Sequence, residues 1–431
     1  MQSQQQPPTQ SIMKLITTPA SATANPGDKK TNQRYTAIVE RLYTKLGDAA
    51  VSSSREISNA EMQSRVRGPS DGEDVPVHSD SFLNLMAVNS ARAERWTKRW
   101  AERYDTGDGE EDFFGGSLKQ KIPDCPPYPV GRSSFVDGQA TERAARMTAA
   151  ALLDAAVDAW ANRGAHQIVP FVLAKPPTHH CCGNETLLRF PKEAKFNPML
   201  RPRDDAFQVG SDSLTPADMA SEEKCASESL ARPFGFCHLN GVAAAASFLL
   251  DQEAMNGTCP KRIAILDFDV HPGNGNEDTF YYDDRVLTIS VHQKDVWPLD
   301  SEEVRQYREG PGRTSLNIEI PQKNVEKDAD ENEDSPPDED DDQRYKQAFL
   351  ESVFPQLEEF GPDFLFVCAG FDAMLNDGYA DMQLSAEWFG WVARELRERY
   401  HSSIPMVWNL EGGYNVENVE QGVQAVLEAF G

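Results

Sequence analysis

The sequence predicts an α/β protein of three layers, in which helices cover both faces of a central, mostly parallel sheet. In its second half, short apolar runs of strand length alternate with longer segments of helical periodicity, as βαβ units require. The apolar run at 263–266, which follows Arg262, is typical of a strand that is buried on both faces of a parallel sheet. All strands of such a sheet deliver their carboxyl ends to one edge, where ligands bind. Polar and ionisable residues follow several of these runs.

The size and charge of the chain exclude some classes of protein. It has 431 residues, enough for one large α/β domain or two ordinary ones, and a net charge of −27. Such acidity argues against binding to nucleic acid through its phosphates, and it suits basic partners such as lysine-rich tails. No apolar stretch reaches the roughly 20 residues that span a bilayer, and no signal-peptide pattern follows the first residue. The 7 cysteines include no metal-type CxxC, so we expect an intracellular protein with free thiols that binds no membrane.

The amino-terminal part of the chain offers few core elements. Residues 1–30 are rich in Gln, Pro and Thr, which predicts a disordered tail before a single domain at 31–431. Apolar residues at helical spacing predict an amphipathic helix at 33–46. The Asp-, Gly- and Pro-containing stretch 105–133 predicts surface loops, whereas the Ala-rich segment 140–160 predicts a helix.

The next strand candidate, at 168–173, leads to two adjacent histidines. Residues 181–232 are polar and aperiodic, which predicts a loop insertion rather than a domain. Residues 324–342 are dominated by Asp and Glu, whose mutual repulsion predicts a disordered acidic loop. Further helices are predicted at 240–250, 345–359, 386–400 and 416–430, and further strands at 286–291, 364–368 and 406–410.

Two strand ends carry candidate metal ligands. Side chains alternate along a strand, so Asp267, Asp269 and His271 share one side of it. Taken alone, this stretch is equally consistent with a solvated Asp-rich turn. Buried together, three ionisable groups are unfavourable unless a cation neutralises them, and carboxylate oxygen and imidazole nitrogen are good zinc ligands. Asp372 follows another strand, so Asp269, His271 and Asp372 predict a three-ligand zinc site with a position left for water and substrate.

Candidates for proton transfer and charge stabilisation come from other strand ends. His179 and His180 can be ordinary polar loop residues, but beside a metal they predict a proton-transfer pair. Asp267 and Asn274 are candidates to hold the second nitrogen of each ring. Tyr414 follows two glycines, and its hydroxyl either donates to an oxygen that becomes negative or belongs to an aromatic that packs on the core.

Six blocks of the sequence resemble the zinc-dependent histone deacetylase family, and two of them, GFDA and EGGY, resemble its class II branch. They follow the family's order from about residue 120 to the end: KPPTHH at 175–180, FGFCHLN at 234–240, LDFDVHPGNG at 266–275, SVH at 290–292, AGFDA at 369–373 and LEGGYN at 410–415. The resemblance implies the arginase/histone deacetylase-like fold. It also implies hydrolysis of N6-acetyl-lysine to lysine and acetate.

The resemblance implies metal ligands residue by residue. Asp269, His271 and Asp372 match the ligands of one catalytic Zn²⁺. Family members also bind a structural K⁺ beside the zinc. The groups that match its site are Asp267, Asp269, His271, Ser290 and Val291.

The resemblance implies catalytic roles as well. His180 matches the general acid–base, His179 matches the histidine that hydrogen-bonds the attacking water, and Tyr414 matches the residue that polarises the acetyl carbonyl. Phe236 matches one wall of the acetyl-lysine tunnel, and Asp124 matches the rim aspartate that holds the substrate backbone. Two further residues are candidates for substrate contact: Gly235 beside Phe236, and Trp297, which either lines a slot or fills the core.

The sequence departs from the family pattern in three places. An early block with His-Pro-Glu and Arg-Ile is not recognisable, and Arg34 is the candidate to replace its arginine. The insertion at 181–232 lies at the edge of the expected site and would reshape substrate access. Pro272 stands where a second histidine is common in the family, which affects the loop and removes no ligand.

Two alternative functions remain open at this point. One is an amidohydrolase of the same fold that acts on acetylated polyamines or other small amides. The other is a catalytically idle scaffold whose acidic loop binds basic partners. For a lysine deacetylase, the expected partners are acetylated protein tails such as histones and a co-repressor-type complex. Family analogy alone favours the nucleus over the cytoplasm.

Overall fold

The computed structural model describes most of the chain beyond residue 137. The described residues are 13–18, 140–164, 168–184, 187, 234–298, 314–322 and 340–431, the backbone at 128–131, 134–136 and 138–139, and the stretch 50–94 without 54, 68, 70–72, 81, 85, 88, 89 and 92. Among these residues no helix is long and apolar enough to cross a membrane.

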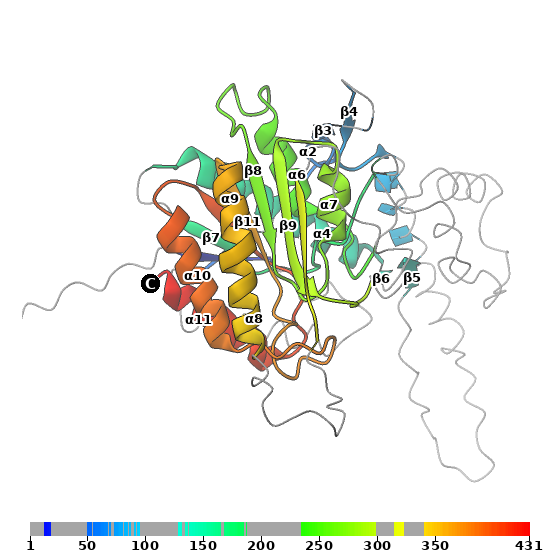
Figure 1. Cartoon of the computed structure of the whole chain (residues 1–431). Coiled ribbons are helices and arrows are strands. Elements are labelled where there is room, and N and C mark those ends of the chain that lie inside the picture. Colours follow the sequence, from blue (N-terminus) through cyan, green and yellow to red (C-terminus); the bar gives the residue numbers. More distant parts are fainter. Residues whose placement is uncertain are drawn as a thin grey trace, which may run out of the picture.

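The core of the fold is an eight-stranded sheet with the strand order β10-β9-β8-β11-β12-β7-β1-β2 (Figure 1). Its strands are β1 Met13–Thr17, β2 Ala50–Ser52, β7 Val169–Val172, β8 Ile263–Asp267, β9 Val286–Gln293, β10 Ser315–Ile320, β11 Phe364–Ala369 and β12 Met406–Leu410. Every pairing between these strands is parallel. The predicted fold class, with its central parallel sheet, is therefore confirmed.

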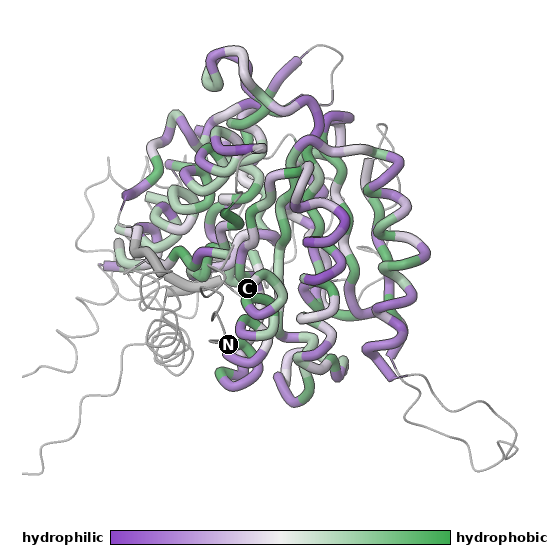
Figure 2. The backbone as a smooth tube through the Cα atoms, turned by 90° about the vertical axis from the view of Figure 1, so that its left-hand side faces the viewer, coloured by the Kyte–Doolittle hydropathy of each residue, from purple (hydrophilic) through white to green (hydrophobic). Residues whose placement is uncertain are grey.

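Helices cover both faces of this sheet and complete the three layers (Figure 1). One face carries α8 Asp341–Ala348, the π-helical segment η5 Phe349–Val353, α9 Phe354–Phe360, α10 Ala386–Tyr400 and α11 Val416–Ala429, and the other carries α4 Gly138–Ala161 and α6 Gly241–Leu250. Each face has its own apolar cluster, and β8 contributes Ala264 and Leu266 to one and Ile263 and Ile265 to the other. Figure 2 shows green strands inside, flanked by helices that alternate between green and purple. The apolar run at 263–266 is thus buried on both faces, as predicted.

The strand order reverses between β8 and β11. From β8 the chain moves outward through β9 and β10, and then returns to place β11 on the other side of β8. In open parallel sheets the ligand crevice lies at such a switch point, outside the carboxyl ends of the strands. The last residue of β8, Asp267, is in register with Cys368 of β11. The segments that follow these two strands therefore emerge side by side.

The prediction of a disordered tail at 1–30 is wrong for residues 13–17. These residues form β1, which pairs with β7 on one side and β2 on the other. Met13 and Leu15 are buried, in the alternating pattern of a strand. The segment is too short to be distinguished from its Gln- and Pro-rich surroundings, and its stability comes from a partner strand more than 150 positions away. The helix predicted at 33–46 lies outside the described residues.

The acidic loop predicted at 324–342 ends earlier than expected. Asp340 caps α8, its carboxylate accepting the backbone N–H of Gln343 at 2.8 Å. Asp341 is buried and accepts a backbone N–H from the loop before α10 at 2.7 Å. Acidic side chains are favourable at a helix N-terminus because its free N–H groups and dipole attract negative charge. Residues 323–339 lie outside the described set, as does the predicted insertion apart from 181–184 and 187.

His78 is a buried histidine that joins the amino-terminal segment to the core. Its Nδ1 donates to the carbonyl of Met62 at 3.1 Å, and its Nε2 accepts the backbone N–H of Asn240, the N-cap of α6, at 3.0 Å. Both bonds need the neutral ring, because a protonated Nε2 cannot accept. Burial accordingly lowers the pKa of His78 to about 3.

This pKa predicts a pH-dependent contribution to stability. Below the ordinary value of 6.5 the unfolded chain takes up a proton that folded His78 refuses, so the free energy of unfolding falls as pH falls towards 3. One such group removes about 1.4 kcal/mol per pH unit in this window. We expect the stability advantage of the native protein over His78→Gln, measured by urea unfolding, to shrink by about 1–2 kcal/mol between pH 6.5 and 5. Because the two proteins share all other histidines, the comparison reports the effect of His78 alone. A difference in unfolding free energy that does not change with pH would contradict the lowered pKa of His78.

Candidate metal centre and active site

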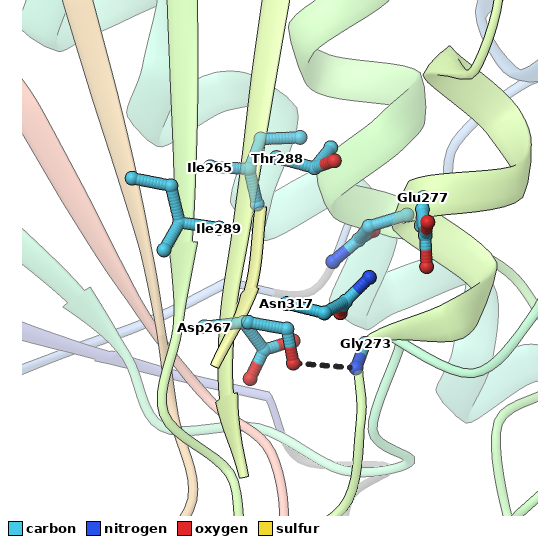
Figure 3. A pocket seen from close by; sticks show the side chains of 9 residues that line it. Ile265, Asp267, Gly273, Glu277, Thr288, Ile289 and Asn317 are labelled. Atoms are coloured by element: carbon cyan, nitrogen blue, oxygen red, sulfur yellow. Dashed lines mark hydrogen bonds between the residues drawn. The ribbon is translucent and has the colours of Figure 1, made fainter. Parts of the chain in front are cut away.

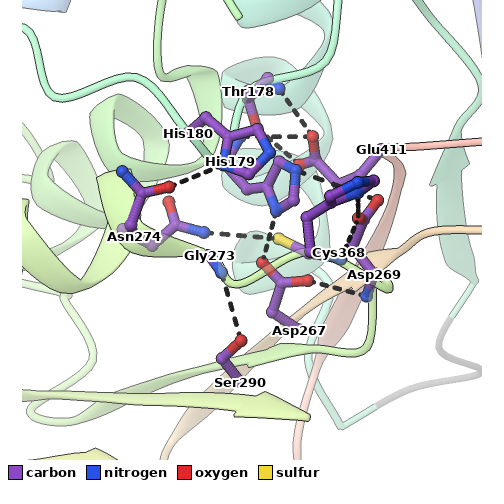
Figure 4. Close-up of polar contacts among 12 residues, drawn as sticks. Thr178, His179, His180, Asp267, Asp269, Gly273, Asn274, Ser290, Cys368 and Glu411 are labelled. Atoms are coloured by element: carbon purple, nitrogen blue, oxygen red, sulfur yellow. Dashed lines mark hydrogen bonds and ion pairs between the residues drawn. The ribbon is translucent and has the colours of Figure 1, made fainter. Parts of the chain in front are cut away.

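The segments after β8 and β11 converge on one buried cluster, and Figure 4 shows one of its members, Asp269, near His179 and Asp267. Nδ1 of His271 lies 3.1 Å from Oδ1 of Asp269 and 3.1 Å from Oδ2 of Asp372. The ligand atoms of all three residues lie within 4.8 Å of one another. Both carboxylates have no exposed surface, and His271 is 7% exposed. The structure thus brings together the three predicted metal ligands, although 101 positions separate His271 from Asp372.

The surroundings of these ligands fit a divalent cation. The backbone N–H of Gly412 donates to Oδ2 of Asp269 at 2.6 Å, and that of Val270 donates to Oδ1 of Asp372 at 3.2 Å. Burial, together with the charge of Asp269, raises the pKa of Asp372, because two carboxylates this close cannot both ionise without a counter-charge. Two carboxylates and one imidazole are a donor set of catalytic zinc sites. A zinc ion held by these three residues would neutralise the cluster.

Gly412 packs so closely against the two carboxylates that no side chain fits at this position. A Cβ on Gly412 would overlap the carboxylate oxygens of Asp372 and Asp269. We expect Gly412→Ala to displace both ligands and to weaken zinc binding by at least about 10-fold, as the loss of groups that orient ligands does. Competition with a chelating dye measures this affinity. In the control Gly390→Ala the new Cβ meets nothing closer than the Arg394 side chain at 3.2 Å, and equal affinities for the two variants would refute the steric argument.

The two adjacent histidines lie beside the cluster, with ring centroids 4.0 Å apart. Nδ1 of His179 lies 3.0 Å from Oδ2 of Asp267, and Nδ1 of His180 lies 2.6 Å from Oδ1 of Asn274. Both acceptors are the ones expected from the sequence. With Nδ1 donating in each ring, the neutral form presents a lone pair at Nε2.

The partners of the two histidines give them different affinities for a proton. Burial opposes a charge on His179, but Asp267 and Asp269 outweigh it and raise its pKa to about 10. Burial, and then the neighbouring imidazoles His179 and His271, lower the pKa of His180 well below its usual range. The two rings therefore differ in proton affinity: the surroundings of His180 favour its neutral form, whereas the carboxylates beside His179 favour its protonated form.

Tyr414 lies in the turn after β12, where Gly413 has a φ of +127°. Its backbone N–H donates to Oδ2 of Asp377 at 2.7 Å. Its ring stacks on Tyr379 and lies 6.0 Å from the ring of Phe236. Burial raises the pKa of the Tyr414 phenol well above its usual range, so the hydroxyl stays protonated and can donate.

A sharp turn at 234–237 carries the candidates for substrate contact. Gly235 and Phe236 have φ values of +55° and +64°, and a side chain at Gly235 would overlap the His180 ring. Trp297 packs edge to face on His180 with centroids 5.0 Å apart, and it stacks on Phe234 at 4.8 Å. Trp297 therefore lies against the histidine pair, and it is joined there by Phe234, a residue for which no role was predicted. Asp124 lies outside the described residues.

A buried set of hydrogen bonds behind the histidines, made by Glu411 and Lys175, was not predicted from the sequence. Glu411, which has no exposed surface, accepts the N–H and hydroxyl of Thr178 at 2.6 and 2.7 Å and the N–H of His179 at 3.3 Å. Nζ of Lys175 donates to the backbone carbonyl of Glu411 and lies 5.8 Å from the ring centroid of Tyr414. Burial lowers the pKa of Lys175. Both residues stand inside the recognised blocks, but nothing in the sequence shows that they touch.

Of the residues expected near a potassium ion, Asp267 lies on β8 and Ser290 and Val291 lie on β9, whereas Asp269 and His271 follow β8 and belong to the metal cluster. Asp267 is in register with Ser290, whose Oγ accepts the backbone N–H of Gly273 at 3.2 Å. A small cavity borders these residues (Figure 3). It is lined by Ile265, Asp267, Gly273, Asn276, Glu277, Thr288, Ile289, Ser290 and Asn317. Neither Tyr414 nor Trp297 lines this cavity, so it is not the entrance for a substrate that reaches the histidines.

Comparison with known sequences identifies one domain. Residues 226–430 match the family model of the histone deacetylase domain. The chain is similar to histone deacetylase 5 of Arabidopsis thaliana (35% identity over 203 residues, 45% of this chain and 28% of that protein) and to histone deacetylase 6 of Caenorhabditis elegans (31% over 206 residues, 47% and 19%). It is also similar to a probable deacetylase of Archaeoglobus fulgidus (34% over 211 residues, 46% and 52%). The chain thus covers about half or less of the length of each relative.

Comparison with solved structures extends the similarity to nearly the whole chain. The HDA15 HD domain has a TM-score of 0.60 at 20% identity, over 97% of this chain and 90% of that one. An acetylpolyamine aminohydrolase from Burkholderia pseudomallei has a TM-score of 0.59 at 19% identity, over 97% and 99%. At these identities the two structures establish the fold.

The fold and the matched domain support a place for this chain in the arginase/deacetylase superfamily. The match to the histone deacetylase domain covers residues 226–430, slightly less than half of the chain.

Proposed function

We propose that the protein is a zinc-dependent lysine deacetylase that hydrolyses N6-acetyl-lysine to lysine and acetate. The observation that carries this proposal is the convergence of Asp269, His271 and Asp372 beside the histidine pair, at the switch point of the sheet. The net charge of −27 supports it, because an acidic protein attracts cationic substrates such as acetylated, lysine-rich tails.

Each side chain at the site has a separate role in the proposed reaction. A zinc ion in the cluster would polarise the acetyl carbonyl and lower the pKa of a water molecule. His180, neutral and with its Nε2 lone pair available, takes the proton from the attacking water and later gives it to the leaving lysine amine. His179, held at Nδ1 by Asp267, hydrogen-bonds the attacking water. Tyr414 donates its hydroxyl to the carbonyl oxygen as negative charge develops there.

The proposal extends to a second ion and to partners. A potassium ion would bind behind the zinc through Asp267, Asp269, His271, Ser290 and Val291, on the family resemblance. Acetylated protein tails, histones among them, are the proposed partners, in a co-repressor-type complex. The nucleus is the proposed compartment on family analogy alone.

An acetylpolyamine amidohydrolase is the second candidate. One observation favours it: the fold matches an acetylpolyamine aminohydrolase as well as it matches a histone deacetylase domain, with TM-scores of 0.59 and 0.60. Both substrate classes present an acetylated primary amine on an alkyl chain. They differ in the polypeptide backbone, which only the protein substrate carries.

Acetate release from an acetyl-lysine histone peptide and from acetylated spermidine, measured side by side, tests the proposal. We expect kcat/KM to be at least about 10-fold higher for the peptide, a difference of about 1.4 kcal/mol in transition-state binding. A chelator should abolish turnover, and added zinc should restore it. The opposite preference would favour the polyamine function, and turnover of neither substrate by zinc-loaded protein would favour an idle scaffold.

A further inference from the structure

The loop 373–385, between β11 and α10, holds Tyr414 at two points. Asp377 in this loop accepts the backbone N–H groups of Tyr414 and Asn415 at 2.7 and 2.8 Å. Two residues later, the ring of Tyr379 stacks on the ring of Tyr414, with centroids 3.9 Å apart and an interplanar angle of 28°. One loop thus contacts both the backbone and the ring of the same residue.

The loop is itself tied to the rest of the fold. Its two ends form a β-bridge between Met374 and Leu384. On one side, the side chain of Asn418 in α11 donates to the carbonyl of Leu375 at 2.9 Å. On the other, Asp341 of α8 accepts the backbone N–H of Gln383 at 2.7 Å. With both flanks anchored to helices, the loop is a platform against which Tyr414 can be held.

Tyr414 needs such a platform because its own backbone does not fix it. It follows two glycines, and Gly413 has a φ of +127°, a conformation that glycine enters and leaves with little strain. Stacking between two aromatic rings favours one arrangement by about 2- to 10-fold in population. Tyr379 is 49% exposed, and its ring stacks on the partly buried Tyr414.

We propose that Tyr379 is a positioning residue that holds the Tyr414 ring in the orientation in which its hydroxyl donates to the acetyl carbonyl. The inference rests on the proposed function, in which Tyr414 makes that hydrogen bond. The bond strengthens as negative charge develops on the carbonyl oxygen, so misplacing Tyr414 affects the transition state more than the ground state. Tyr379 therefore acts on kcat, and it acts only through Tyr414.

A double-mutant cycle tests this coupling. We expect Tyr379→Ala to lower kcat by about 10-fold while KM changes by less than about 3-fold, and Tyr379→Phe, which keeps the stacking ring, to stay within about 2-fold of the native enzyme. In a Tyr414→Phe background, Tyr379→Ala should lower kcat by less than about 2-fold, because the hydroxyl that it positions is absent. Leu375→Ala is the matched control, since Leu375 is also 49% exposed in the same loop. Thermal melts confirm that each variant is folded.

Affinity for an alkyl hydroxamate, measured by calorimetry on the zinc-loaded variants, separates this inference from the proposed function. If the native protein turns over no acetylated amine, the proposed function fails, yet the hydroxamate still reports whether Tyr379 acts through Tyr414. Equal fold-losses from Tyr379→Ala in both backgrounds would overturn the inference. So would a loss from Tyr379→Phe as large as that from Tyr379→Ala, or an effect confined to KM.

Discussion

Asp372→Asn is expected to remove the metal and to lower kcat/KM by at least about 10³-fold, because the proposed chemistry depends on zinc as Lewis acid and source of the nucleophile. Asp372 has no exposed surface, and its Oδ2 lies at the centre of the cluster, 3.1 Å from His271. The substitution keeps the volume of the side chain and replaces an anionic ligand with a neutral amide. Loss of a direct ligand should weaken zinc binding by more than the roughly 10- to 100-fold that follows the loss of a supporting contact.

In the metal-free protein, the same substitution is not expected to lower thermal stability. Burial, and then repulsion from Asp269 when no cation lies between the two carboxylates, raises the pKa of Asp372. We expect metal-free Asp372→Asn to melt no lower than the metal-free native protein, while added zinc stabilises the native protein alone. Elemental analysis after desalting measures the bound metal. Asp158→Asn, at an exposed position of α4, is the control, and one zinc per chain in Asp372→Asn would refute the ligand assignment.

His180→Ala is expected to lower kcat by about 10²- to 10⁴-fold while zinc remains bound, because positioned proton transfer contributes that much to such reactions. His180 contacts Asn274 and the aromatic side chain of Trp297, and it is not among the three metal ligands. The loss should therefore fall on the chemical step, with little change in metal content or in hydroxamate binding.

Single-turnover kinetics and metal analysis of the same samples check this expectation. His401→Ala provides a matched control, because His401 follows α10 and precedes β12, at the edge of the sheet opposite the metal cluster. Its turnover should equal that of the native enzyme. A His180→Ala enzyme that keeps more than about a tenth of native kcat would show that another group moves the proton.

The elements with strong periodic patterns were predictable from the sequence. The helix at 386–400 and the strand at 406–410 have the predicted bounds, and the predicted metal ligands meet because parallel strands share one edge. These inferences needed only local pattern and the general geometry of parallel sheets. The family resemblance then supplied roles for the residues at that edge.

What the sequence could not show depends on contacts between distant segments. β1 lies in a polar context and is recognisable only beside β7, and β10 was not predicted because its side chains are only partly buried. The contacts of Glu411 with Thr178, and of Tyr379 with Tyr414, join residues with no shared local pattern. Such pairs become visible only when the chain is folded.

The strand order also has a consequence for folding during translation. β11 and β12 fill the space between β7 and β8, although both are synthesised after them. A nascent chain that has emerged only as far as β10 has two half-sheets with unpaired inner edges, and such edges invite aggregation. The two halves of the sheet can pair only after β11 has been synthesised, and Asp372 follows β11 directly. The sheet and the predicted metal site are therefore completed at the same stage of synthesis. Metal uptake during translation would therefore report the moment at which the halves join.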